Sequence, residues 1–167
     1  MEFILRREEP KDIEQVHAIL CSTFPTEAES RLVDALRTSG KAVLSLVAVS
    51  GDQVLGHILF SPVTTTPPNT AKGVGLAPVA VRTDVQAKGI GSRLIKEGLR
   101  QCKFHGFDYC VVLGEPKYYQ RFEFQKASNY GIQNEYGVED EFMWIRFSER
   151  NVSGVVHYAP EFAAFSV

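Results

Sequence analysis

One stretch near the middle of the chain, residues 75–104, constrains the fold more than any other. An apolar, β-branched segment, residues 75–81, leads through a short polar loop into a helical pattern that begins at about Gly89. In that pattern apolar side chains recur every three or four residues, the spacing that places them on one helix face. A strand that passes through a tight loop into an amphipathic helix is a unit of mixed α/β proteins. The sequence therefore predicts a mixed α/β fold.

Other segments extend this pattern on both sides. Helical periodicity runs from Pro10 to Phe24 and again in a second stretch that stops at Gly40, and residues 43–49 and 54–60 read as a β-hairpin. A loop is predicted at residues 64–70. The remaining expected elements are a first strand at residues 3–6, a strand at 109–113, a short helix at 117–121, and strands near 142–147 and 154–158.

Composition places the chain among ordinary globular domains. Its 167 residues predict a single domain over residues 1–167, and 44% hydrophobic with 23% charged residues is an average balance. A net charge of -2 is not the strongly basic balance that is typical of nucleic-acid-binding domains. No apolar run approaches the roughly 20 residues of a membrane-spanning helix, and the N-terminus lacks a signal-peptide pattern. We therefore expect a cytoplasmic protein with neither nucleic acid nor membrane as partner.

Cysteine and histidine spacing points to no metal centre. The three cysteines form no CxxC pair, and their odd number argues against a disulfide framework. The four histidines, at positions 17, 57, 105 and 157, match no zinc signature. The sequence predicts no metal.

The turn at the start of the central helix has the chemistry of a phosphate site. Gly89 and Gly91 open the helix, where the first amide N–H groups lack intrahelical partners and the helix dipole adds partial positive charge. Lys88 and Arg93 add charge beside them. A simple tight turn remains an alternative for this Gly-x-Gly match. The spacing fits neither a dinucleotide fingerprint, because Leu94 stands where the third glycine belongs, nor a P-loop.

Pro78 points to the kind of molecule that would carry the phosphates. It stands inside a strand that the pattern makes central, and proline is tolerated in strands chiefly at edges and bulges. A bulge would leave backbone groups free to pair with a ligand that has amides of its own. A diphosphate joined to an amide-bearing arm describes coenzyme A (CoA).

Two motifs together give the chain a family resemblance. Val81, a loop and then Gln86-Ala87-Lys88-Gly89-Ile90-Gly91 form the first; Tyr118-Tyr119-Gln120-Arg121-Phe122-Glu123-Phe124, preceded by Leu113-Gly114-Glu115-Pro116, form the second. The sequence resembles the GNAT superfamily of N-acetyltransferases, in particular its small YhbS-like branch. Thr83, Val85 and Glu123 depart from the family pattern, the last replacing a glycine. The resemblance implies a mostly antiparallel central sheet with a splayed, bulged parallel strand pair, flanked by helices on both faces.

The resemblance also implies which residues hold acetyl-CoA. Backbone groups of Val79, Ala80 and Val81 would pair with its pantetheine arm. The pyrophosphate would lie against the segment Gln86, Ala87, Lys88, Gly89, Ile90, Gly91 and Ser92. Tyr119 matches the family tyrosine that contacts the CoA sulfur and gives it a proton, with Tyr118 as the second candidate; either ring could instead be a packing aromatic.

The base that deprotonates the attacking amine is less well defined by the sequence. Glu115, just past the end of an apolar strand, is the first candidate, with a structural role as its alternative. Glu29, His57 and an ordered water chain are the others. The acceptor pocket is expected from the two N-terminal helices, the loop at 64–70 and the C-terminal strands.

The resulting functional hypothesis is an acetyl-CoA-dependent N-acetyltransferase. It would transfer an acetyl group to a primary amine of a small molecule or peptide by direct attack in a ternary complex. A non-catalytic acyl-CoA-binding or sensing domain is the alternative from another class, and a structural domain without a ligand is a third. A homodimer is a further possibility, since relatives commonly pair through their C-terminal strands.

Overall fold

The computed structural model describes residues 2–165, which divide into two compact units. The first unit comprises residues 1–60, 77–98 and 160–167, and the second comprises residues 61–76 and 99–159. Strands β3 and β4 and helix α3 each contribute residues to both units.

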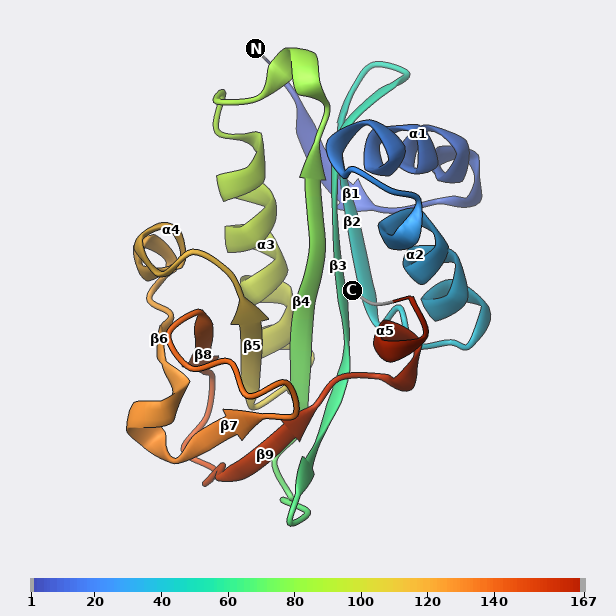
Figure 1. Cartoon of the computed structure of the whole chain (residues 1–167). Coiled ribbons are helices and arrows are strands. Elements are labelled where there is room, and N and C mark those ends of the chain that lie inside the picture. Colours follow the sequence, from blue (N-terminus) through green and yellow to red (C-terminus); the bar gives the residue numbers. More distant parts are fainter. Residues whose placement is uncertain (1, 166–167) are drawn as a thin grey trace. The chain divides into compact units, whose positions relative to one another are not determined.

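The first unit joins a strand meander to helices (Figure 1). Antiparallel β1 and β2 pair with Ile4 opposite Val49, and β2 pairs with β3 with Leu44 opposite Phe60. The elements in this unit are β1 (Ile4–Arg7), a 3-10 turn (Pro10–Asp12), α1 (Ile13–Thr23), α2 (Ala28–Thr38), β2 (Leu44–Ser50), the first part of β3 (Gln53–Thr66), the end of β4 (Gly73–Val81), a 3-10 turn (Thr83–Val85), the first part of α3 (Ile90–Phe104), and α5 (Pro160–Ala164).

Alternation along β3 assigns the helices to opposite faces of this sheet. Gly56 faces α3, because a Cβ there would lie 3.1 Å from side-chain atoms of Ile90 and Leu94. His57, the next residue, faces the other way: it contacts Ser45, which bonds Glu8, and Glu8 pairs with Arg37 of α2. The predicted helices on both faces are therefore present in this unit.

The second unit contains both parallel strand pairs found among the described residues. β4 pairs with β5 in parallel, Gly73 opposite Tyr109, and β7 pairs in parallel with β9. Antiparallel β8 joins β5 to β6, and β9 joins the end of β3. Its own elements are β5 (Tyr109–Leu113), α4 (Pro116–Tyr119), a 3-10 turn (Gln120–Phe122), β6 (Gln125–Lys126), a 3-10 turn (Ala127–Tyr130), β7 (Ile132–Asn134), β8 (Phe142–Arg146) and β9 (Gly154–His157).

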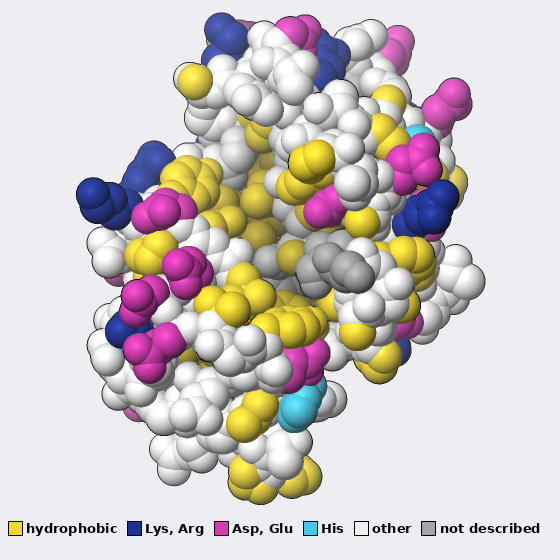
Figure 2. Space-filling view, in the orientation of Figure 1, with side chains coloured by type: hydrophobic (Ala, Val, Ile, Leu, Met, Phe, Trp, Pro, Cys, Tyr) yellow, Lys and Arg dark blue, Asp and Glu magenta, His cyan; other side chains and the backbone are white. Residues whose placement is uncertain are grey.

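The mixed α/β prediction is confirmed, with one loop placed wrongly. Thr64, Thr65 and Thr66 belong to β3 rather than to a loop, because they pair with residues 155–157 of β9. The short strands β6 and β7 and helix α5 were not predicted. Within residues 2–165, no helix combines the length and hydropathy needed to cross a bilayer. On the face shown in Figure 2, basic side chains are scattered among acidic ones.

Candidate functional site

The turn that precedes α3 is built around two left-handed residues of the first unit. Ala87 has φ 62° and Gly89 has φ 83°. The buried side chain of Val85 anchors the approach to the loop, and the N–H of Arg93 donates to the carbonyl of Gly89 at 3.1 Å to close the first helical turn. A Cβ at Gly89 would meet nothing within 4 Å, so glycine is needed for its backbone conformation rather than for space.

This geometry leaves a run of backbone donors available. Within residues 2–165, no oxygen of the chain accepts a hydrogen bond from the amides of residues 87–92. Gln86 has a different position, because its side-chain amide donates to the carbonyl of Val81 at 3.1 Å and ties the loop to the strand end. Six consecutive free amides at a helix start make an anion site, helped by the helix dipole.

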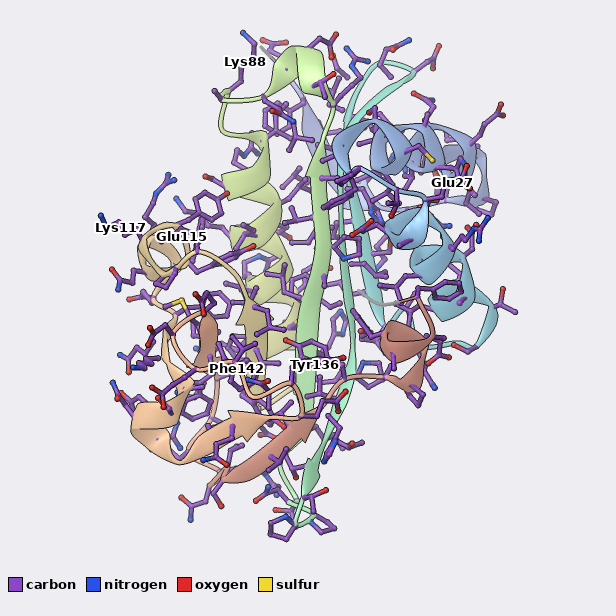
Figure 3. All side chains as sticks on the ribbon, viewed as in Figure 1. Glu27, Lys88, Glu115, Lys117, Tyr136 and Phe142 are labelled. Carbon is purple, nitrogen blue, oxygen red and sulfur yellow. The ribbon has the colours of Figure 1, made fainter. Side chains whose placement is uncertain are left out.

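The two basic residues of the turn differ in their surroundings. Lys88 is exposed and projects outward from the loop (Figure 3). The guanidinium of Arg93 lies over the ring of Phe3, 4.6 Å from its centroid. Arg93 is therefore engaged with an aromatic side chain, and Lys88 is the better placed of the two to supply charge to a bound anion.

The strand residues predicted to hold a pantetheine arm belong to the same unit as the turn. Ala80 is buried, whereas Val79 and Val81 are half-buried. Next to them the N–H of Arg82 donates to the carbonyl of Leu55 at 2.8 Å, which holds the strand end on β3. The first unit therefore brings together all predicted CoA-binding residues except Tyr119.

Tyr119 belongs to the second unit, where it ends α4 with a buried ring. The ring makes edge contacts with Tyr118 and Phe124, at centroid distances of 5.1 and 5.6 Å. It lies against Gly114 so closely that a Cβ there would be 2.3 Å from a ring carbon. Burial raises the pKa of Tyr119 to about 12, so the hydroxyl keeps its proton at neutral pH.

Glu115 caps α4. Its carboxylate accepts from the N–H of Lys117 at 3.3 Å, and its carbonyl accepts from the amides of Tyr118 and Tyr119 at 3.1 Å. Pro116, at the first helical position, has no N–H to satisfy. The structure thus gives Glu115 a helix-capping role at an exposed position (Figure 3).

Glu123, which stands where the family motif has a glycine, adopts the backbone conformation that glycine favours. It has φ 72°, in the left-handed region where glycine is free of strain. The turn that follows Tyr119 therefore keeps its shape with glutamate in place of glycine.

The other two base candidates named from the sequence lie in the first unit. His57 is fully buried, with Nε2 2.9 Å from the hydroxyl of Ser45. Desolvation lowers the pKa of His57 to about 4, so it is a neutral core residue. Glu29 lies in the first turn of α2, and its Oε1 is buried without a hydrogen-bond partner in the described chain.

Sequence reasoning missed one hydrogen-bonded chain of side chains in the second unit. Thr66 bonds His157 and His157 bonds Glu135, each at 2.8 Å. No spacing signal could have found it, because 91 residues separate Thr66 from His157. Residues 2–165 contain no group of three or more His, Cys, Asp or Glu side chains that could hold a metal ion.

Comparison with known proteins gives the chain a family. The acetyltransferase (GNAT) family profile matches residues 13–124. The uncharacterized N-acetyltransferase YhbS of Escherichia coli K12 is 34% identical over 167 residues, covering 97% of this chain and 99% of YhbS. The uncharacterized N-acetyltransferase YjhQ of the same strain is 29% identical and covers 83% and 79%.

Two solved structures have the same fold. The crystal structure of E. coli YhbS in complex with CoA superposes with a TM-score of 0.92 at 32% identity, covering 98% of this chain and 93% of that one. A GNAT family acetyltransferase from Brucella melitensis, in complex with acetyl-CoA, gives a TM-score of 0.82 at 34% identity, with coverage of 96% and 98%. With the two motifs, the amides without an acceptor among residues 2–165 at the start of α3, and these matches in agreement, the chain belongs to the GNAT family of acetyltransferases.

Proposed function

We propose that this chain transfers the acetyl group of acetyl-CoA to a primary amine of a small molecule or peptide, by direct attack in a ternary complex. The observation that carries the proposal is the run of amides at residues 87–92, which have no acceptor among residues 2–165. Two similar proteins also support the proposal, because the YhbS structure contains CoA and the Brucella structure contains acetyl-CoA.

In this proposal the first unit holds the carrier. The amides of residues 87–92 donate to the pyrophosphate, and Lys88 adds positive charge at the rim. Backbone groups of Val79, Ala80 and Val81 pair with the amides of the pantetheine arm. These are backbone contacts, so they select the carrier by its shape and hydrogen bonds rather than by side-chain chemistry.

The second unit would supply acid catalysis. The neutral amine forms a bond to the thioester carbonyl carbon, the C–S bond breaks, and the hydroxyl of Tyr119 gives its proton to the leaving thiolate. The raised pKa of Tyr119, about 12, keeps this hydroxyl protonated until the thiolate forms. The sequence-predicted base, Glu115, stays a candidate because its exposed carboxylate holds only one bond, at 3.3 Å.

The test combines binding with turnover. We expect CoA to raise the melting temperature of the purified chain, because a ligand that binds only the native state stabilises it by about 2.7 kcal/mol at a hundredfold excess over its Kd. With acetyl-CoA and a panel of benzylamine, spermidine and a glycine-initiated tetrapeptide, we expect release of free CoA thiol. CoA binding without thiol release from any amine would favour the sensing domain, and no thermal shift would contradict both.

A further inference from the structure

In the second unit, two strands and the turn after a third bring together a hydroxyl, an imidazole and a carboxylate. His157 lies opposite Thr64 in the β3–β9 ladder, so Thr66 is its diagonal neighbour on the same face. Asn134 lies opposite Val156 in the β7–β9 ladder, and the amide of the next residue, Glu135, donates to the carbonyl of Val156 at 3.2 Å. The strand register itself therefore places Glu135 beside His157.

Thr66, His157 and Glu135 form a relay whose hydrogen bonds place a hydrogen on Nδ1 of the imidazole. The Oε2 atom of Glu135 lies 2.8 Å from Nδ1 of His157, and the hydroxyl of Thr66 lies 2.8 Å from Nε2. An ionised carboxylate only accepts, so Nδ1 carries a hydrogen, and in the neutral ring Nε2 accepts from Thr66. In the charged ring both nitrogens donate, and the threonine oxygen can accept. The relay therefore accommodates one extra proton by turning the hydroxyl hydrogen of Thr66, without moving a heavy atom.

A pair of tyrosines connects the relay to β4, which pairs with the strand that leads to Tyr119. The ring of Tyr136, the residue that follows Glu135, lies 6.1 Å from that of Tyr158. Tyr158 packs on β4 at Gly75, where a Cβ would be 2.6 Å from its ring. Burial raises the pKa of the Tyr158 hydroxyl, and Cys110, Tyr136, Glu135 and Tyr119 act on it in the same direction. Gly75 lies opposite Val111 of β5, the strand that leads into α4 and Tyr119, so the Tyr158 ring packs beside the strand pair that carries Tyr119.

The exposure of these groups suits proton exchange. The side chains of His157 and Glu135 are 38% and 25% exposed, and Tyr136 is 41% exposed. They can therefore meet a substrate or pass a proton to solvent, unlike the fully buried His57. Tyr136 lies in the turn that follows β7, whereas Glu115 caps α4 (Figure 3).

We propose that Glu135 is the base of the acetyl transfer, with His157 and Thr66 as positioning residues behind it. This inference rests on the proposed function. The amine gives a proton to Glu135 as its nitrogen bonds the thioester carbon, the C–S bond breaks, and Tyr119 protonates the thiolate. Solvent then takes the proton from Glu135 and returns one to Tyr119, so the enzyme ends unchanged. Glu115 and Glu135 are rival assignments for one role.

The experiment compares variants of the full chain with acetyl-CoA and whichever amine of the panel reacts fastest. General-base catalysis is typically worth a factor of 10²–10⁴. We expect Glu135→Gln to lower kcat about a hundredfold, with the Kd of CoA unchanged. His157→Ala should lose about tenfold and recover part of that loss on addition of imidazole, whereas Thr66→Val should lose about threefold. Rescue by imidazole separates proton handling from a merely structural role.

Matched controls use groups of the same kind outside the relay. Glu139→Gln changes an exposed carboxylate that pairs with Lys126, and His17→Ala changes an exposed imidazole of α1; both should keep wild-type kcat, without imidazole rescue. Wild-type kcat in Glu135→Gln would overturn this inference alone. Loss of CoA binding by the wild-type chain would overturn the proposed function. If the wild-type chain binds CoA but acetylates no amine, both the transferase proposal and the assignment of Glu135 as its base would be overturned.

Discussion

Helices α3 and α4 begin in opposite ways. At α4 the cap is complete: Glu115 accepts from Lys117 with its side chain and from Tyr118 and Tyr119 with its carbonyl, and Pro116 has no amide to satisfy. At α3 the amides of residues 87–92 have no acceptor among residues 2–165. A helix start that is capped by its own chain contributes to folding, whereas one left open beside glycine is available to a ligand.

The same contrast divides the proposed chemistry between the two units. The start of α3 would act through backbone groups, which bind but cannot exchange protons at neutral pH. Helix α4 ends in Tyr119, whose ring is buried and whose pKa is raised to about 12. Substitutions at the two helices should therefore separate binding from turnover.

Tyr119→Phe should have the largest effect, on turnover alone. It removes the hydroxyl and keeps the ring that packs against Phe124 and Gly114. We expect kcat to fall by about a hundredfold to a thousandfold, because an acid of this kind typically contributes 10²–10⁴. The Kd of CoA, measured by calorimetry, should stay within twofold. A variant that loses CoA affinity and keeps kcat would reverse the proposed division between the helices.

Replacing His57 should change how the free energy of unfolding depends on pH and leave turnover unchanged. Its folded pKa of about 4 lies below the unfolded value near 6.5, so the unfolded chain binds more protons between these pH values. The free energy of unfolding should therefore fall by about 3 kcal/mol from this group as pH drops from 7 to 4. Urea unfolding of the wild type and His57→Leu at both pH values should show that fall only in the wild type. A large loss of kcat in His57→Leu at pH 7, with folding intact, would instead make His57 the base.

Gly89→Val should affect CoA binding. At φ 83° a β-branched residue is strained, so the loop must change shape and misalign its amides. We expect the Kd of CoA to rise about a hundredfold. Gly106→Val is the matched control, because Gly106 has φ 87° and equally open space at the other end of α3. Equal losses of CoA affinity in the two variants would show that the effect is general destabilisation.

The contrast between the helices also shows what the sequence could and could not reveal. The Gly-x-Gly turn and Tyr119 are local motifs, and the helices predicted at both are present, whereas their roles toward CoA stay predictions. The sequence shows that Glu115 follows an apolar strand, but it does not show that the Glu115 side chain turns toward the N–H of Lys117 and caps the helix. Strands of two or three residues, such as β6 and β7, have too few positions to show a period.

The relay from Thr66 to Glu135 was beyond local reasoning for a different reason. It depends on the register of β9 against both β3 and β7, and pairing over such sequence separations leaves no periodic trace. The sequence predicts a loop at residues 64–70, yet the pairing of Thr66 with Val155 extends β3 to that point.

Glu115 should affect stability at the capped helix. Glu115→Ala removes the acceptor for Lys117, and loss of such a cap costs about 1 kcal/mol of unfolding free energy, measurable by urea titration. Glu115→Gln keeps an acceptor oxygen, so it should retain most of that stability and full kcat. A hundredfold loss of kcat in a stable Glu115→Gln variant would assign the base to Glu115 and leave Glu135 without that role.

Lys88 should give the smallest effect, because its exposed charge is screened by salt. Lys88→Ala removes the cation beside the free amides and leaves their geometry unchanged, so we expect the Kd of CoA to rise about threefold at low ionic strength and less at 0.5 M NaCl. Lys96→Ala, at an exposed position two turns into α3, is the control and should leave the Kd unchanged. Because backbone donors persist in both variants, CoA should still bind to each. Loss of binding in Lys88→Ala would mean that a side-chain charge, and not the open helix start, holds the pyrophosphate.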